Sequence, residues 1–252
     1  MAYCAATNKH NGSRLILSAS RRISRGSQST SMLRRCHRRV SLPIVSQTLK
    51  YYDDNAQAFY DGTVSADMAQ GRARFIEALP PGGRILDAGC GSGRDALAFN
   101  HLGFDVTAFD GSAEMVRLAT NHTGLEVLQL TFEEVDWRET FDGIWANASL
   151  LHVPRDQLVG VMRKLRDALV IGGVWELSFK PGAGEGVAFG RWFTNLSEAD
   201  VPALIAEVGG LEILAVTSSY DFRTGKSQEG WTNILVRRGN SAVFRLGPTQ
   251  GS

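Results

Sequence analysis

Apolar residues after Tyr51 follow two alternating patterns. Short apolar runs bounded by glycine, proline or polar residues are typical of buried strands, and between them the apolar residues recur at helical spacing. The clearest helix is expected over 156–169, where Leu158, Val161 and Leu165 share one face. Strands that alternate with helices in this way predict an α/β fold.

The pattern predicts seven strands and at least four helices. The strands are expected at 85–88, 104–109, 125–130, 143–147, 174–179, 211–217 and 231–236. Besides 156–169, helices are expected at 95–102, at 113–120 and from Ser197 to Val208, where Ser197 and Asp200 resemble a capping box.

Charge divides the chain sharply. The first fifty residues hold ten lysines and arginines and no acid, whereas residues 51–252 hold 17 basic and 26 acidic residues. The first segment also has nine serines and one short apolar run, so it cannot bury enough surface to offset chain entropy, and we expect it to be disordered. The expected organisation is a basic segment at 1–50, a folded domain at 51–240 and a tail at 241–252.

Three roles are open for segment 1–50. An arginine- and serine-rich, acid-poor start is typical of organelle transit peptides. It also suits a basic arm for an acidic partner, or upstream sequence with no role if the working chain starts at Met32 or later. Because the rest of the chain carries no other address, we expect a cytoplasmic protein, with organelle import as the alternative. The oligomeric state is not predicted.

The composition argues against several classes of binding partner. An acidic domain argues against broad binding to nucleic acid, and no apolar run approaches the roughly 18 residues of a membrane span. The three cysteines, Cys4, Cys36 and Cys90, form no metal-type pair, so a reducing compartment is expected and no metal site is predicted.

A glycine-rich turn follows the first expected strand. Asp87 is followed by glycines at every second position, Gly89, Gly91 and Gly93, just before a helix. Glycine lets the backbone approach a ligand closely, and a helix N-terminus favours a carboxylate or phosphate. A carboxylate at Asp87 would repel a pyrophosphate but attract an ammonium group. The spacing also differs from the G-x-G-x-x-G of dinucleotide sites.

A second acid ends the next strand. Asp110 lies 17 residues after Gly93, where a carboxylate can accept hydrogen bonds from both hydroxyls of a ribose. The site therefore suits a ligand with an amino-acid ammonium and a nucleoside sugar, and S-adenosyl-L-methionine has both. The alternative is that the two acids only cap helices.

With these motifs the chain resembles the class I S-adenosylmethionine-dependent methyltransferases over residues 51–238. The run from Gly89 to Asp95 is also similar to the tellurite-resistance-type, small-molecule subgroup. The resemblance implies a Rossmann-like, seven-stranded and mostly parallel sheet with helices on both faces. It also implies one antiparallel strand near the C-terminus, at 231–236.

The resemblance also implies roles for individual residues. Asp87 and the glycine loop would hold the methionine part of the cofactor, and Asp110 its ribose. Tyr52 and Tyr60 would lie on a lid helix over the sulfonium, where aromatic faces favour a cation. The full set of implied cofactor residues is Tyr52, Tyr60, Asp87, Gly89, Cys90, Gly91, Gly93, Asp110, Gly111, Ser112, Met115, Thr131, Phe132, Ala146 and Leu151.

Several of these residues have a simpler interpretation. Met115 is equally compatible with helix core, and Tyr52 and Tyr60 with ordinary packing. Cys90 is interpreted as loop filler within the motif, because no base lies near it in the sequence. The partner of the adenine amino group is not identified.

Methyl transfer from a sulfonium depends mostly on in-line positioning and desolvation. A general base is needed only if the acceptor must lose a proton, and His152, after the fourth strand, is the candidate. By the family's geometry the acceptor pocket would be lined by Arg155, Lys180, Arg191, Arg223 and Trp231, which would suit a small, anionic molecule. Hydrogen-bonded packing is the alternative for His152, and solvated surface for the others.

The predicted function is transfer of a methyl group from S-adenosyl-L-methionine to a small-molecule acceptor. Two alternatives stand beside it. One is a protein that binds the cofactor without turnover, as a sensor or scaffold, because no acceptor motif is diagnostic. The other is a nicotinamide-dependent oxidoreductase, for which Asp87 and the glycine spacing are unsuitable.

Overall fold

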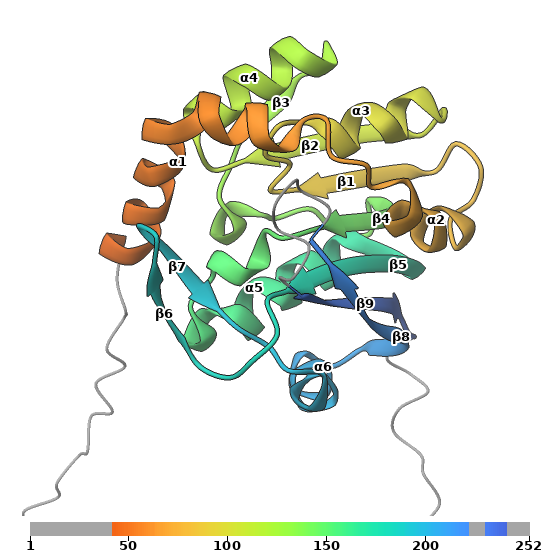
Figure 1. The fold of residues 1–252 in the computed structure, drawn as a ribbon. Helices are drawn as coiled ribbons and strands as arrows, with labels where there is room; N and C mark the ends of the chain where they lie inside the picture. Colours follow the sequence, from red (N-terminus) through yellow and green to blue (C-terminus); the bar gives the residue numbers. More distant parts are fainter. Residues whose placement is uncertain (1–41, 222–229, 241–252) are drawn as a thin grey trace, which may run out of the picture. The chain divides into compact units, whose positions relative to one another are not determined.

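One large sheet forms the centre of the fold. The computed structural model describes residues 42–221 and 230–240 (Figure 1). The strands of the sheet are β1 (Arg84–Ala88), β2 (Asp105–Asp110), β3 (Val127–Gln129), β4 (Phe141–Ala146), β5 (Leu169–Phe179), β8 (Leu211–Tyr220) and β9 (Gly230–Arg238). Each of the seven strands predicted from the apolar runs is present, so the α/β prediction is confirmed.

The strand order is β3-β2-β1-β4-β5-β9-β8. Strand β9 runs antiparallel to both of its neighbours, and the other pairings are parallel, as predicted. The order reverses between β1 and β4. In open α/β sheets the crevice beyond such a reversal, at the carboxyl ends of the strands, is the usual place for a ligand.

Strand β5 begins earlier than predicted. Phe141 of β4 pairs with Leu169 and Gly143 with Val174, so residues 170–173 bulge out of the ladder. The pair Gly172 and Gly173 lies inside the bulge, where Gly172 has a φ of 83°.

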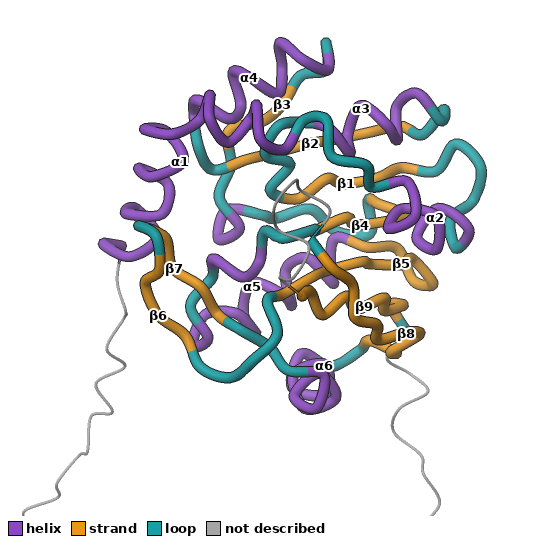
Figure 2. The backbone as a smooth tube through the Cα atoms, viewed as in Figure 1, coloured by secondary structure: helices purple, strands orange, loops and turns teal. Residues whose placement is uncertain are grey.

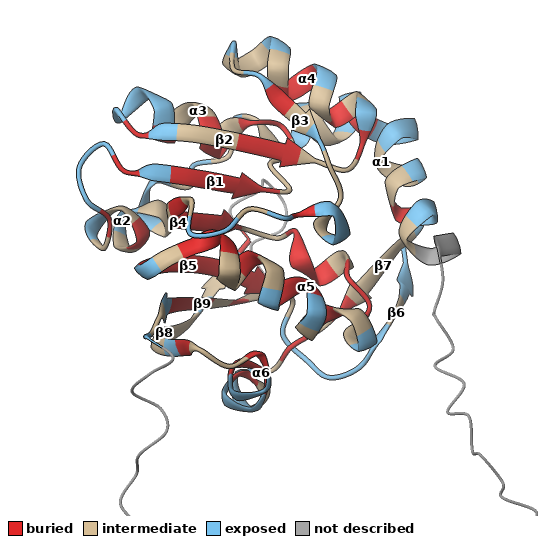
Figure 3. Ribbon diagram, turned by 180° about the vertical axis from the view of Figure 1, so that it is seen from behind, coloured by how far each residue is buried: buried red, intermediate tan, exposed pale blue. Residues whose placement is uncertain are grey.

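Helices cover both faces of the sheet (Figure 2). They are α1 (Leu42–Thr63), α2 (Ala69–Glu77), α3 (Arg94–His101), α4 (Ala113–Thr123), α5 (Arg155–Ala168) and α6 (Val201–Val208). Helices α2, α3 and α4 pack on one face through Phe75, Phe99 and Ala119, and α5 and α6 pack on the other through Met162 and Ile205. Buried residues therefore concentrate along the strands between the two helical layers (Figure 3). The four predicted helices are present, and α2 was not predicted.

Helix α1 lies beyond the carboxyl ends of the strands (Figure 1). It begins at Leu42, so the predicted boundary at residue 50 falls inside a helix and residues 42–50 do not form a disordered segment. The physical reason is packing, because Thr48 is 4% exposed and accepts a hydrogen bond of 3.0 Å from the backbone N–H of Trp192. The rest of the predicted basic segment and the tail lie outside the described residues.

A two-stranded hairpin, β6 (Glu185–Ala188) and β7 (Arg191–Thr194), was not predicted. The strands pair antiparallel, and Phe189 and Gly190 turn between them with φ of 50° and 77°. Helix α1 packs on β7, so the hairpin and α1 lie on the same side of the sheet.

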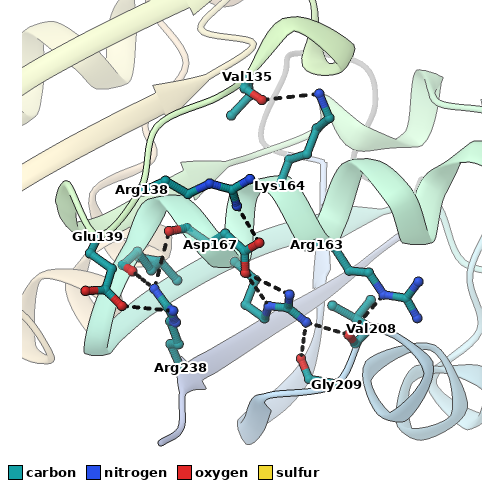
Figure 4. Close-up of polar contacts among 11 residues, drawn as sticks. Val135, Arg138, Glu139, Arg163, Lys164, Asp167, Val208, Gly209 and Arg238 are labelled. Atoms are coloured by element: carbon teal, nitrogen blue, oxygen red, sulfur yellow. Dashed lines mark hydrogen bonds and ion pairs between the residues drawn. The ribbon is translucent and has the colours of Figure 1, made fainter. Parts of the chain in front are cut away.

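Two arginines of α5 hold the end of α6, a group we call the α5–α6 clamp. Arg166 donates to the carbonyl oxygens of Val208 at 2.7 Å and Gly209 at 3.0 Å, and Arg163 donates to that of Val208 at 3.3 Å. Asp167 accepts from Arg166 and from Arg138 (Figure 4). These cations meet the negative end of the α6 dipole, which favours them.

Within 42–221 and 230–240, no helix combines the length and the apolar content that a membrane crossing requires.

Candidate functional site

A cavity of about 700 Å³ lies at the carboxyl ends of the strands, where the strand order reverses. Its walls come from the turns after β1 and β2, the segments after β3 and β4, helix α1, the β6–β7 hairpin, and the ends of β5, β8 and β9. Segments far apart in the sequence therefore converge on one site.

Asp87 lines this cavity, and one oxygen of its carboxylate has no hydrogen-bond partner. It lies near the end of β1, is 2% exposed, and its Oδ2 is buried with no hydrogen-bond partner. Burial raises the pKa of Asp87 well above its ordinary value, and the nearby Asp95 carboxylate raises it further. A buried acceptor in this state is stabilised by a cationic donor, so the structure fits the ammonium group expected here.

The first two glycines of the loop serve the cavity. At Gly89, φ is 76° and a Cβ would lie 2.6 Å from the Cβ of Ser149, so any side chain would collide with the segment after β4. Gly91, with a φ of 55°, donates its N–H to Asp110 Oδ2 at 2.9 Å. Both residues, and Cys90 between them, line the cavity.

Gly93 has a different role from the one predicted. It lies outside the cavity lining, and a Cβ there would come within 2.7 Å of Thr123 Cγ2 and 3.1 Å of Ala119 Cβ. Its glycine therefore allows α3 to pack closely against α4. Burial raises the pKa of the Cys90 thiol, and the carboxylates of Asp87 and Asp110 add to this, so the thiol stays protonated and is no nucleophile.

Asp110 ends β2 with its carboxylate in the cavity. Its Oδ1 accepts the N–H of Ser112 and its Oδ2 that of Gly91, both at 2.9 Å. Each oxygen keeps a lone pair, so the carboxylate can still accept two hydroxyl hydrogen bonds. Gly111 also lines the cavity, and a Cβ there would come within 2.7 Å of Leu49 Cδ2 on α1.

Of the two predicted residues Ser112 and Met115, only Met115 lines the cavity. Ser112 does not line the cavity. It caps α4, accepting the N–H of Met115 at 3.2 Å and donating its own hydroxyl to Asp53 at 2.6 Å. Met115 does line the cavity, together with Thr131 and Phe132 from the segment after β3.

At the end of β4 the residue predicted from the sequence does not line the cavity. Ala146 is fully buried in the core and does not line the cavity, whereas the next residue, Asn147, does. Successive strand residues point to opposite sides, so a shift of one residue exchanges core for cavity. Leu151, also predicted, lines the cavity and is 1% exposed.

His152 lines the cavity, and its hydrogen-bond partners determine which ring nitrogen carries the proton. Its Nδ1 lies 2.6 Å from the carbonyl oxygen of Trp192, to which it can only donate, so Nε2 carries the lone pair. Nε2 accepts the hydroxyl of Tyr52 at 2.8 Å. Burial lowers the pKa of His152 to about 4, and the charge of Arg191 lowers it further, so the imidazole is neutral near pH 7.

Tyr52 and Tyr60, both predicted for the lid, lie on different sides of α1. Tyr52 lines the cavity, with Arg191 Nη1 at 3.3 Å from its hydroxyl oxygen. Tyr60 packs instead against α4, outside the cavity lining, with its hydroxyl 3.1 Å from His122 Nδ1. Phe59, which the sequence argument did not single out, lines the cavity in its place.

Three of the predicted acceptor residues reach the cavity. Arg191, Lys180 and Trp231 line it, and Lys180 Nζ lies 4.0 Å from the centre of the Trp231 ring and 3.5 Å from Asp221 Oδ2. Arg155 does not line it, because it begins α5 beyond the turn, where its N–H donates to Glu185.

Arg223 lies outside the described residues. In the described parts of the chain, no group of three or more histidine, cysteine and acidic side chains is arranged to hold a metal ion.

Sequence reasoning missed several residues of α1, the hairpin and the far strands that line the cavity. Tyr51 and Phe193 face Arg191, and Ser219 and Asn233 line the opposite end. Of these four residues, only Tyr51 and Phe193 had a signal in the sequence. Each belongs to an aromatic pair, Tyr51-Tyr52 before Asp53 and Trp192-Phe193 after Arg191.

Comparison with known proteins identifies the domain. Residues 85–173 match the family described as a methyltransferase domain. A ubiquinone biosynthesis O-methyltransferase of Xanthomonas campestris is 33% identical over 105 residues, which cover 39% of this chain and 43% of that protein. The probable S-adenosyl-L-methionine-dependent methyltransferase TehB of Haemophilus influenzae is 23% identical over 95 residues, covering 36% of this chain and 33% of that protein.

A solved structure shares the fold over most of the chain. The 1,6-didemethyltoxoflavin-N1-methyltransferase of Burkholderia thailandensis, with bound 1,6-didemethyltoxoflavin and S-adenosylhomocysteine, has a TM-score of 0.64 and 21% identity. The match covers 78% of this chain and 87% of that one. The chain spans less than half the length of the two curated relatives. The family match over residues 85–173 confirms the methyltransferase prediction for that part of the chain, and the solved structure supports the fold.

Proposed function

We propose that this class I methyltransferase domain transfers a methyl group from S-adenosyl-L-methionine to a small-molecule acceptor. The observation that carries the proposal is the buried, unpartnered oxygen of Asp87, which lies beside the glycine loop and in the same cavity as Asp110. A cation and a ribose are the two groups that these carboxylates suit.

Each part of the cofactor has residues that suit it. Asp87 would accept the ammonium group, Asp110 would accept the two ribose hydroxyls, and Met115 and Phe132 would contact the adenine. When bound, the cofactor supplies a methyl group on a sulfonium sulfur, and the leaving group is neutral. The cavity of about 700 Å³ lies within the range of roughly 300–1,000 Å³ of small-molecule sites.

The residues of this chain would then act on the acceptor by position and proton transfer. Hairpin and α1 side chains line the cavity, and a bound acceptor would displace water between them, which desolvates the attacking atom. His152 is the proposed general base, because its Nε2 lone pair faces a cavity-lining hydroxyl. Its pKa of about 4 makes it a weak base, so it suits only an acceptor whose proton is acidic.

Calorimetric titration of the full chain tests the cofactor. S-adenosyl-L-methionine should bind, NADH should not, and Asp87→Asn and Asp110→Asn should each weaken binding about a hundredfold. Glu114→Gln, an equal charge change on the exposed side of α4, should leave the affinity unchanged. NADH binding in its place, or full affinity in both aspartate variants, would overturn the assignment.

A further inference from the structure

A tyrosine, a histidine and an arginine meet at the hairpin side of the cavity. We propose that the acceptor is a planar molecule with an acidic hydroxyl, such as a phenol or an enol. Arg191 holds its oxygen as it becomes an anion, and Tyr52 passes the proton on to His152. This inference rests on the methyl transfer proposed above and names its substrate class.

Arg191 is the strongest observation. Its guanidinium lies 4.8 Å from the ring centre of Tyr51 and 5.1 Å from that of Phe193. Its Nε is buried with no hydrogen-bond partner, and no carboxylate among the described residues lies within ion-pair distance of it. The Arg191 guanidinium therefore lies between aromatic rings and has an N–H donor without a partner. Such a group favours binding of an oxyanion, which a guanidinium holds through paired N–H groups.

The charge of the proposed cofactor supports the same conclusion. The sulfonium and Arg191 would both place a positive charge in one cavity. Like charges repel, and an acceptor that is negative during attack relieves this repulsion.

Tyr52 and His152 provide the path for a proton. The hydroxyl of Tyr52 lies between two partners, His152 Nε2 at 2.8 Å and Arg191 Nη1 at 3.3 Å. Because the carbonyl of Trp192 takes the Nδ1 proton, Nε2 is the only ring atom free to accept a new one. Tyr52 therefore can take a proton from the acceptor while giving its own to His152.

The reaction balances with these groups alone. Methylation of a hydroxyl forms one oxygen–carbon bond and breaks the carbon–sulfur bond, whose electron pair stays on the sulfur. It also releases one proton, which moves from the acceptor through Tyr52 to His152 Nε2 and then to water. No oxidant, reductant or metal takes part in this step.

Together, Arg191 and the proton path from Tyr52 to His152 select the class of acceptor. A carboxylate is already ionised near pH 7 and needs no base, and an aliphatic alcohol is too weak an acid for a neutral imidazole. An acidic hydroxyl is protonated in solution and gives up its proton inside the cavity, so it uses both the base and Arg191. The rings of Tyr51, Phe193 and Trp231 line the cavity and suit a planar molecule.

The test uses 4-nitrophenol, which absorbs visible light only as the phenolate. The full chain, saturated with S-adenosylhomocysteine so that no reaction occurs, is titrated with the probe at a pH below the probe's own pKa. We expect the phenolate band to grow on binding. An opposite charge at contact distance lowers the pKa of such a group by roughly one to three pH units.

Variants of the full chain assign the effect to Arg191. Arg191→Gln should reduce the bound phenolate fraction about tenfold or more, and Arg191→Lys, which keeps the charge without the paired N–H groups, should reduce it less. Arg117→Gln on the exposed face of α4 is the matched control and should behave as the wild type. Affinity for S-adenosylhomocysteine, measured in parallel, shows that each variant is folded.

The possible outcomes separate this inference from the proposed function. Binding of the cofactor with no phenolate band, or with an equal band in Arg191→Gln, overturns the acidic-hydroxyl acceptor and leaves methyl transfer standing. Loss of cofactor binding in the wild type overturns the proposed function itself. A band in the wild type that is lost in Arg191→Gln supports both.

Discussion

Two tyrosines of α1 show how strongly a residue's role depends on the direction in which its side chain points. Tyr52 and Tyr60 both hydrogen-bond a histidine, but only the pair formed by Tyr52 and His152 lines the cavity. The two therefore form a matched pair of sites, with the same chemistry inside and outside the proposed centre.

Removing each hydroxyl should separate these sites. Tyr52→Phe breaks the proton path to His152, so we expect kcat to fall about a hundredfold, the lower end of what general acid–base catalysis contributes. The KM for the cofactor should change little, because the ring stays in place. Tyr60→Phe loses the comparable bond to His122 and should keep wild-type kcat. Steady-state rates with the same acceptor measure both, and equal losses would mean that the effect comes from α1 packing.

At this scale the sequence predicted residues whose geometry is local. Asp87 and Asp110 each end a strand, so their place in the cavity follows from the strand and the turn after it. Ala146 and Ser112 do not line the cavity, because a register of one residue, or the choice of helix cap, decides which side chain faces it. The meeting of Tyr52 and Arg191 joins residues 139 positions apart, which no local pattern contains.

At the scale of elements, segments with long, regular apolar patterns were predicted best. Helix α5 was predicted to within one residue at each end, because its apolar face repeats over the whole element. The start of α1 was missed because basic and serine residues dominate the composition before residue 50 and hide the few residues that pack, such as Thr48. The β6–β7 hairpin was missed because it is held by its contact with α1, not by an alternating apolar pattern.

The α5–α6 clamp carries a prediction of its own. Arg166→Ala leaves the carbonyl of Gly209 without its side-chain donor and that of Val208 with only the longer bond from Arg163, so the free energy of unfolding should fall by about 1–3 kcal/mol. Because the clamp lies outside the cavity lining, affinity for the cofactor should not change. Urea unfolding and calorimetry measure the two effects. Arg117→Ala on α4, whose Nε bonds only a neighbouring exposed glutamate, is the control and should cost less than about 1 kcal/mol. A cofactor affinity that falls with stability would show that the two regions are coupled.

On the scale of the whole molecule, the strand order creates the site. Because β1 and β2 pair in parallel, Asp87 and Asp110 come together at their carboxyl ends, and the reversal between β1 and β4 places a crevice beside them that α1 and the hairpin also line. The sequence predicted the α/β class from its alternating pattern, and the antiparallel strand only through the resemblance to a family. Strand order depends on pairings between distant segments, which periodicity does not encode.

The same sheet buries a carboxyl group that should make stability depend on pH. Glu176 of β5 is 5% exposed, and burial raises its pKa from 4.5 to about 8, against the opposing charge of Arg74. Between these two values the folded chain keeps a proton that the unfolded chain loses, so this group's contribution to stability is complete below about pH 4.5 and is lost as the pH rises to about 8.

Glu176→Gln removes this titration and should therefore gain stability relative to the wild type as the pH rises. The difference in unfolding free energy between variant and wild type should grow across that window by at most about 1.4 kcal/mol per pH unit. Urea unfolding of the full chain at several pH values measures it, and comparison at each pH cancels the titration of Asp87, Asp110 and His152. Glu212→Gln on the exposed side of β8 should give a constant difference. A constant difference for Glu176→Gln as well would mean that Glu176 is ionised in the folded protein and that Arg74 compensates its burial.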